Sequence, residues 1–239
     1  MDNHCKIRVN QSLYETIAIF GHSNMKSMTH KKVESWQVTA AIAAAAVFWF
    51  FLFSPVVPGL NFWFVLSIAA GTLAAWAIWC GGVPFELKQF QLKAIGIGAV
   101  AAVMLYVIFV LGDLFSGLLF PSFAPDQVGS VYAMKKMSNP VLISLMLLFV
   151  SSPCEEIFWR GFLQKWAMNQ WGNIPGWLAA SACYAAVHIV SGNFILVMAA
   201  WIAGLFWGLM YLWLKENLVP VIISHSLWTF GIFILAPVM

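Results

Sequence analysis

The feature that most constrains this chain is a succession of apolar segments about as long as a membrane is thick. A helix needs roughly 20 apolar residues to cross the hydrocarbon core, where its backbone must satisfy its own hydrogen bonds. Such segments lie at 38–57, 62–83, 94–112, 140–160 (extending to about 168 if the helix continues), 175–191, 194–214 and 219–237. We therefore predict an all-α, polytopic integral membrane helix bundle of seven spans, or eight if Phe115–Phe123 inserts as well.

Composition excludes the soluble classes of protein. Apolar residues make up 62% of the chain and charged residues 9%, whereas an average soluble domain has about 25% charged residues. So few charges cannot cover the surface of a soluble enzyme, a nucleic-acid-binding domain or a disordered tail. The 4 cysteines are scattered without paired spacing, which argues against a disulfide-rich secreted domain.

Basic residues gather on one side of the expected bundle, at the N-terminus and in alternate connections. They are Lys6, Arg8, Lys26, Lys31, Lys32, Lys88, Lys93, Arg160, Lys165 and Lys215, and only Lys135 and Lys136 fall on the other side. Because cytoplasmic loops carry the excess of Lys and Arg, the N-terminus is predicted to be cytoplasmic. We divide the chain into a polar cytoplasmic tail at 1–36, supporting helices at 37–138 and a functional core at 139–239.

Five ionisable residues fall inside the apolar spans and are therefore candidates for function. They are Glu155, Glu156, Arg160, His188 and His225. A charged group at the centre of a membrane costs a few kcal/mol even on insertion scales, so its presence by default indicates a functional role. Gly204 and Gly208 form a GxxxG pair, which predicts close helix packing and no chemistry.

Helical geometry separates the two glutamates. Glu156 and Arg160 are four residues apart, so they share a helix face and are expected to pair. Glu155 points about 100° away from Glu156 and has Trp159 at the position where a partner would stand. The turn expected near Gly172 places Glu155 and His188 at similar depth, whereas His225 is expected to be shallower unless the loop before it dips inward.

A carboxylate and an imidazole that face each other in a low-dielectric cavity can activate a water molecule together. Glu155 and His188 have this potential, and His225 could donate a hydrogen bond to the oxyanion that forms on an attacked carbonyl. The groups fit hydrolysis of an amide bond near a membrane surface.

At these residues the sequence resembles a known family. Glu155-Glu156-xxx-Arg160, Tyr184-xxx-His188 and His225 are similar to the motifs of the CPBP family (CAAX protease and bacteriocin-processing, or Abi), which includes the Rce1-type prenyl endopeptidases. The resemblance covers roughly residues 140–230. It implies a glutamate-dependent intramembrane protease without a cofactor, in which Glu155 and His188 activate water while Glu156 and Arg160 support the site.

The third motif of that family is usually His-xxx-Asn or His-xxx-Asp, and the pair helps to form the oxyanion hole. This chain has Thr229 at the second position. A threonine can donate one hydrogen bond but lacks the reach of an amide. By resemblance we count His225 and Thr229 as catalytic candidates. The departure at Thr229 has three interpretations, namely a variant subfamily, weaker catalysis or a site with another purpose.

The resemblance also implies the partners and the location. The substrate would be a membrane-anchored protein or peptide that carries a CAAX-like tail, a leader peptide or a C-terminal sorting anchor. The protein would be a multi-pass component of the lipid bilayer, and the lack of an organellar presequence favours a prokaryotic inner membrane. We expect no nucleic-acid partner.

Three other interpretations stay open at this stage. Glu155, His188 and His225 together could bind zinc, although no HExxH motif is present. Cys154 could be a nucleophile with His188 and Arg160, as in exosortase-like cysteine transpeptidases. Outside enzymology, the chain could be a non-catalytic membrane scaffold, immunity or regulatory protein of the same family.

Overall fold

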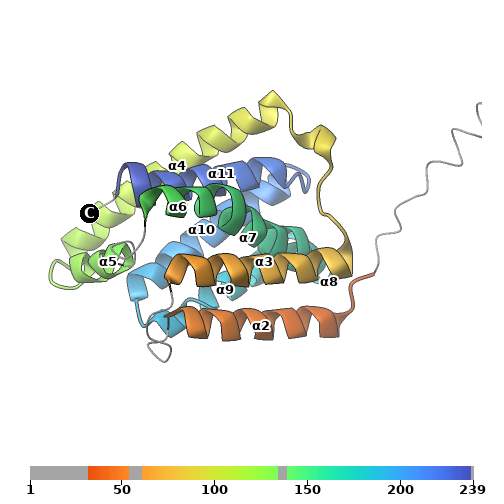
Figure 1. Cartoon of the computed structure of the whole chain (residues 1–239), viewed down its shortest axis with the longest axis horizontal. Coiled ribbons are helices and arrows are strands. Elements are labelled where there is room, and N and C mark those ends of the chain that lie inside the picture. The colour runs from red at the N-terminus through yellow and green to blue at the C-terminus, as the bar shows by residue number, and fades with distance from the viewer. Residues whose placement is uncertain (1–31, 54–60, 134–138, 238–239) are drawn as a thin grey trace, which may run out of the picture. The chain divides into compact units, whose positions relative to one another are not determined.

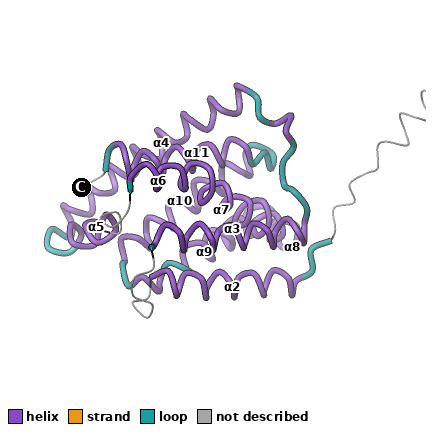
Figure 2. The backbone as a smooth tube through the Cα atoms, viewed as in Figure 1, coloured by secondary structure: helices purple, strands orange, loops and turns teal. Residues whose placement is uncertain are grey.

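The regular secondary structure of the described chain is entirely helical (Figure 2). A computed structural model describes residues 32–53, 61–133 and 139–237, which belong to one structural unit. The longer helices are α2 (Ser35–Phe53), α3 (Phe62–Gly81), α4 (Leu92–Leu119), α5 (Ala124–Ala133), α9 (Asn173–Ala186), α10 (Phe194–Trp213) and α11 (Val219–Phe230). Three short helices, η1 (Leu87–Gln89), η4 (Ile189–Ser191) and η5 (Gly231–Leu235), lie in connections or extend α11.

A polytopic membrane bundle is confirmed. Within the described residues, six helices are long and apolar enough to cross a membrane, and a shorter apolar helix covers Val219–Leu235. The prediction for Phe115–Phe123 as a separate inserted piece is wrong, because α4 continues to Leu119 and no Pro interrupts it before Pro121. A short helix that we did not predict, α5, follows this proline.

The fourth span is a continuous helical run from Pro140 to Trp171. Its consecutive parts are α6 (Pro140–Met146), η2 (Leu147–Ser151), α7 (Ser152–Phe158), η3 (Trp159–Gln164) and α8 (Lys165–Trp171). The η2 and η3 segments are π-helical, a geometry often found at functional sites. Pro153 lacks an N–H, so the turn before it cannot keep regular α-helical bonding. The π-helical segment η2 therefore ends about one turn before the two glutamates.

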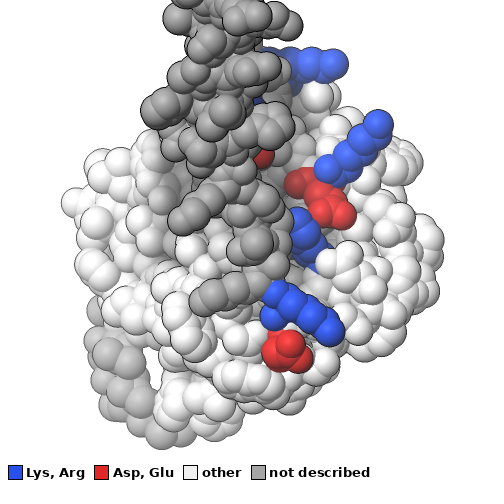
Figure 3. All heavy atoms as spheres, turned by 90° about the vertical axis from the view of Figure 1, so that its right-hand side faces the viewer, with Lys and Arg blue, Asp and Glu red and all other residues white. Residues whose placement is uncertain are grey.

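Successive spans run in opposite directions across the bundle (Figure 1). One end, on the right in Figure 1, holds the start of α2, the α3–α4 connection, the turn after α8 and the α10–α11 connection. This end, called the basic end below, carries the surface ion pairs Lys88–Glu86 (2.7 Å) and Lys165–Glu216 (3.3 Å) (Figure 3).

The prediction that Arg160 is one of the flanking basic residues is wrong, because Arg160 is only 2% exposed inside the bundle. Its guanidinium is paired there and contributes nothing to the charge of a connection. Lys135, Lys136 and the tail before Lys32 lie outside the described residues.

The expected close packing at the two glycines is confirmed between α9 and α10. A Cβ added at Gly204 would lie 3.2 Å from Cδ1 of Tyr184, and one at Gly208 would lie 2.6 Å from Cδ1 of Trp177. The absence of both side chains lets α9 approach the backbone of α10. It also leaves the carbonyl groups of α10 open to donors from the fourth span.

Candidate active site

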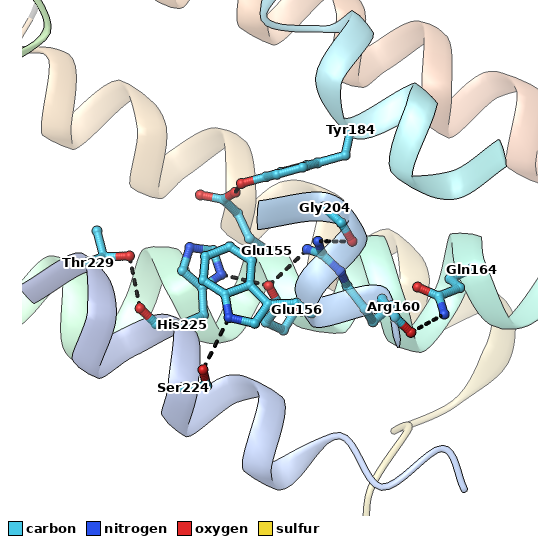
Figure 4. A network of polar contacts seen from close by, with 11 residues as sticks. Glu155, Glu156, Arg160, Gln164, Tyr184, Gly204, Ser224, His225 and Thr229 are labelled. Atoms are coloured by element: carbon cyan, nitrogen blue, oxygen red, sulfur yellow. Dashed lines mark hydrogen bonds and ion pairs between the residues drawn. The ribbon is translucent and has the colours of Figure 1, made fainter. Parts of the chain in front are cut away.

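Glu156 is held from two sides at the centre of the bundle. Its Oε1 accepts a hydrogen bond from Nη1 of Arg160 at 2.9 Å and lies 2.6 Å from Nδ1 of His225 (Figure 4). The pairing of Glu156 with Arg160 is therefore confirmed. Contact with His225 was not predicted, and it makes the carboxylate of Glu156 a bridge between the fourth span and α11.

Three further groups fix Arg160. Its Nη2 donates to the carbonyl oxygen of Gly204 at 3.4 Å, and its guanidinium lies over the rings of Tyr184 (4.8 Å) and Trp207 (5.4 Å). One turn later, Gln164 donates to the carbonyl oxygen of Gly208 at 2.8 Å. Sequence reasoning missed Gln164, although it stands four residues after Arg160 and thus on the same helix face.

Glu155 points away from this network, as the helical geometry predicts. Its Oε2 accepts a hydrogen bond of 3.3 Å from the hydroxyl of Tyr184, and its side chain lines a cavity of about 130 Å³. Glu155 is 7% exposed, whereas Glu156 is completely buried. Adjacent glutamates thus have different environments, one closed by Arg160 and His225 and one at an internal space that can hold water.

The cavity brings together the candidate residues from three parts of the chain. Its polar lining is Ser152, Glu155, Tyr184, His188, His225 and Thr229. Most of the remaining wall is aromatic or aliphatic and includes Trp49, Phe53, Phe62, Trp63, Leu196 and Phe233. A mainly apolar cavity with a few convergent polar groups is the usual form of a substrate site.

His188 follows the C-terminal end of α9, and both of its ring nitrogens have partners. Nδ1 lies 2.8 Å from the carbonyl oxygen of Tyr184, and Nε2 accepts a hydrogen bond of 3.2 Å from the indole N–H of Trp49. These contacts assign the neutral imidazole with its proton on Nδ1. Trp49 belongs to α2, 139 residues from His188, so no local pattern in the sequence could have identified it.

His225 lies deep enough to line the same cavity as Glu155. It is 5% exposed and stacks on Trp207, with ring centroids 3.8 Å apart. Because Nδ1 faces Glu156, Nε2 is the nitrogen left for a group in the cavity, and no described residue makes a hydrogen bond to it. A short α10–α11 connection places α11 at this depth.

Thr229 also lines the cavity, one turn after His225. Its hydroxyl donates to the carbonyl oxygen of His225 at 2.9 Å. In this arrangement the hydroxyl hydrogen is used inside the helix, so Thr229 offers only oxygen lone pairs to the cavity.

For the described residues, no group of three or more His, Cys, Asp or Glu side chains is placed to hold a metal ion. Cys154, the alternative nucleophile, is a half-buried free thiol. The cavity lining found among the described residues does not include it.

Comparison with known proteins finds a similarity over the same residues. Residues 137–231 match the family model for type II CAAX prenyl endopeptidase Rce1-like proteins. A search of curated proteins gives no match. The matched segment contains every candidate of the site from Glu155 to Thr229, so the part of the chain that is similar to this family is the part that forms the site.

Proposed function

We propose that the protein hydrolyses a peptide bond in a membrane-tethered substrate with water activated by Glu155 and without a metal cofactor. One observation carries this proposal. A carboxylate that forms no ion pair with a described residue and two imidazoles, from three different spans, line one cavity. The match to a protease family over the same residues supports the reaction class.

Glu155 accepts a proton from a water molecule in the cavity, and the water oxygen attacks the carbonyl carbon of the substrate. Negative charge develops on the carbonyl oxygen, to which protonated His225 donates a hydrogen bond from Nε2. The carboxylate of Glu156 holds Nδ1 and stabilises the imidazolium. The proton then passes from Glu155 to the leaving nitrogen, the C–N bond breaks, and an acid and an amine leave.

His188 would orient the attacking water through Nε2. This nitrogen already accepts the indole N–H of Trp49, so water must displace one hydrogen bond before His188 can act. Trp49 and α2 therefore belong to the functional site in this proposal, whereas the sequence assigned α2 to supporting helices.

The test compares the termini of membrane proteins in cells that express the wild-type chain or Glu155→Gln at matched levels. We expect specific termini to disappear with Glu155→Gln and to survive chelator treatment of the wild type. Glu86→Gln is the matched control, because Glu86 is exposed outside the cavity, where it pairs with Lys88 and caps η1, and a glutamine keeps an oxygen for the capping bond. Unchanged termini with Glu155→Gln would contradict the proposal.

A second candidate function is a non-catalytic scaffold or immunity protein. Two observations favour it over a protease, namely the occupied Nε2 of His188 and the internally bonded hydroxyl of Thr229. In that case Glu155→Gln, folded normally, would keep the cellular phenotype.

A further inference from the structure

We propose that the cavity receives its substrate from the face of the membrane opposite the basic end, so that the substrate is an apolar peptide segment on the non-cytoplasmic side. This inference rests on the proposed function and deepens it. It selects leader peptides or anchors of exported proteins over a cytoplasmic prenylated tail.

The cavity lies in one half of the bundle, as the positions of its lining residues on each helix show. Helices that start at the basic end contribute their last turns, as Phe53 of α2 and Phe233 after α11 do. Helices that end there contribute their first turns, as Phe62 of α3 and Leu196 of α10 do. The space therefore extends from Glu155, near the middle of the fourth span, away from the basic end.

Charge on the described connections differs between the two ends. The basic end carries Lys32, Lys88, Lys93, Lys165 and Lys215. At the opposite end, the described connections and α5 carry only the acidic residue Asp126. Because Lys and Arg are retained on the cytoplasmic side, the basic end is cytoplasmic and the cavity faces the other side.

Helix α5 marks the aqueous rim of the cavity. It is the least apolar of the longer helices, and polar contacts fasten it to the start of α10. Asn193 donates to the carbonyl oxygen of Gln127 and to the hydroxyl of Ser130, both at 2.8 Å, and the amide oxygen of Gln127 accepts from the N–H of Phe194 at 2.9 Å. Val131, on the same helix, lines the cavity.

The residues that line the cavity also determine the polarity of the peptide that it can hold. The described lining includes Val131, Phe53, Phe62, Trp63 and Leu196, and apart from Glu155 it holds no Asp, Glu, Lys or Arg. His188, which contacts Phe53, contributes a neutral imidazole. A charged side chain would lose its hydration there without gaining a partner. The peptide that reaches Glu155 is therefore apolar and uncharged around the bond that is cleaved.

The orientation is tested with single added cysteines and a membrane-impermeant charged maleimide on intact spheroplasts. Peptide mapping by mass spectrometry reads each site separately, so the native cysteines stay. We expect Val131→Cys and Phe123→Cys to be labelled in intact cells, whereas Lys88→Cys is labelled only after the membrane is permeabilised. Labelling of Lys88→Cys in intact cells, with Val131→Cys protected, would overturn the inference.

The substrate class is tested with the termini that Glu155→Gln abolishes. We expect them to belong to segments on the non-cytoplasmic side of their anchors, with apolar residues on both sides of the cleavage point. Loss of cytoplasmic C-termini instead would overturn this inference and leave the proposed peptidase activity standing. Loss of no termini would remove the proposed function, while the labelling pattern would still report the orientation of the cavity.

Discussion

Glu155 and Glu156 are neighbours in the chain and are both at least nine-tenths buried, yet their surroundings differ completely. Glu156 belongs to a closed network in which Arg160 and His225 share one of its oxygens. Glu155 has a single described hydrogen bond, from the neutral hydroxyl of Tyr184, and faces a cavity. A step of one residue along a helix thus separates a group that stabilises the bundle from a group that is available for chemistry.

The largest expected difference in stability is between two single variants, in which either Glu156 or Glu155 is replaced by glutamine. Glu156→Gln leaves the buried guanidinium of Arg160 without a countercharge, which should lower the free energy of unfolding by about 3–5 kcal/mol. Glu155→Gln keeps an oxygen for Tyr184 and should cost less than about 1 kcal/mol. Reversible unfolding of both variants in detergent measures the difference, and equal losses would contradict the proposed division between the two residues.

A second test concerns the helix contact that supports the network. A Cβ at Gly208 would lie 2.6 Å from the ring of Trp177 and 2.8 Å from Oε1 of Gln164. Gly208→Ala should therefore destabilise the protein by about 1–3 kcal/mol through overpacking. Gly71→Ala in α3 is the matched control, because no atom lies within 4 Å of its added Cβ, and it should stabilise by up to about 1 kcal/mol. Thermal unfolding of the two variants must shift in opposite directions.

The sequence alone predicts the contacts within one helix. The length of the apolar runs predicts the spans, and a spacing of four residues predicts the pair of Glu156 and Arg160. Contacts between helices that are far apart in the sequence could not be predicted from it. Periodicity specifies which face of a helix is polar, but not which helix lies against that face, so Trp49 beside His188 and Glu156 beside His225 emerge only in three dimensions.

The third test concerns His188, which lines the same cavity as Glu155. Trp49→Phe removes the indole N–H that occupies Nε2 of His188. If water must displace this bond, whose net contribution is about 0.5–1.5 kcal/mol, the variant should cleave substrate a few-fold to about tenfold faster. Trp76→Phe is the matched control, since the indole of Trp76 donates to the backbone of Gln37. A slower Trp49→Phe enzyme would show that the indole positions His188 for catalysis.

The smallest effect is expected at Thr229, where the cavity carries a hydroxyl in place of the amide or carboxylate of the family motif. Because the hydroxyl donates to the carbonyl oxygen of His225, it has no hydrogen left for an oxyanion, and Thr229→Val keeps its shape. Cleavage by Thr229→Val should stay within about threefold of the wild-type rate. The variant loses only the hydrogen bond from the threonine hydroxyl to the carbonyl of His225, and a second bond to a helix carbonyl contributes well under about 1 kcal/mol. A loss of tenfold or more in a rate assay on purified protein would mean that Thr229 turns its hydroxyl toward the substrate during the reaction, and that the oxyanion is stabilised from α11 by two residues instead of by His225 alone.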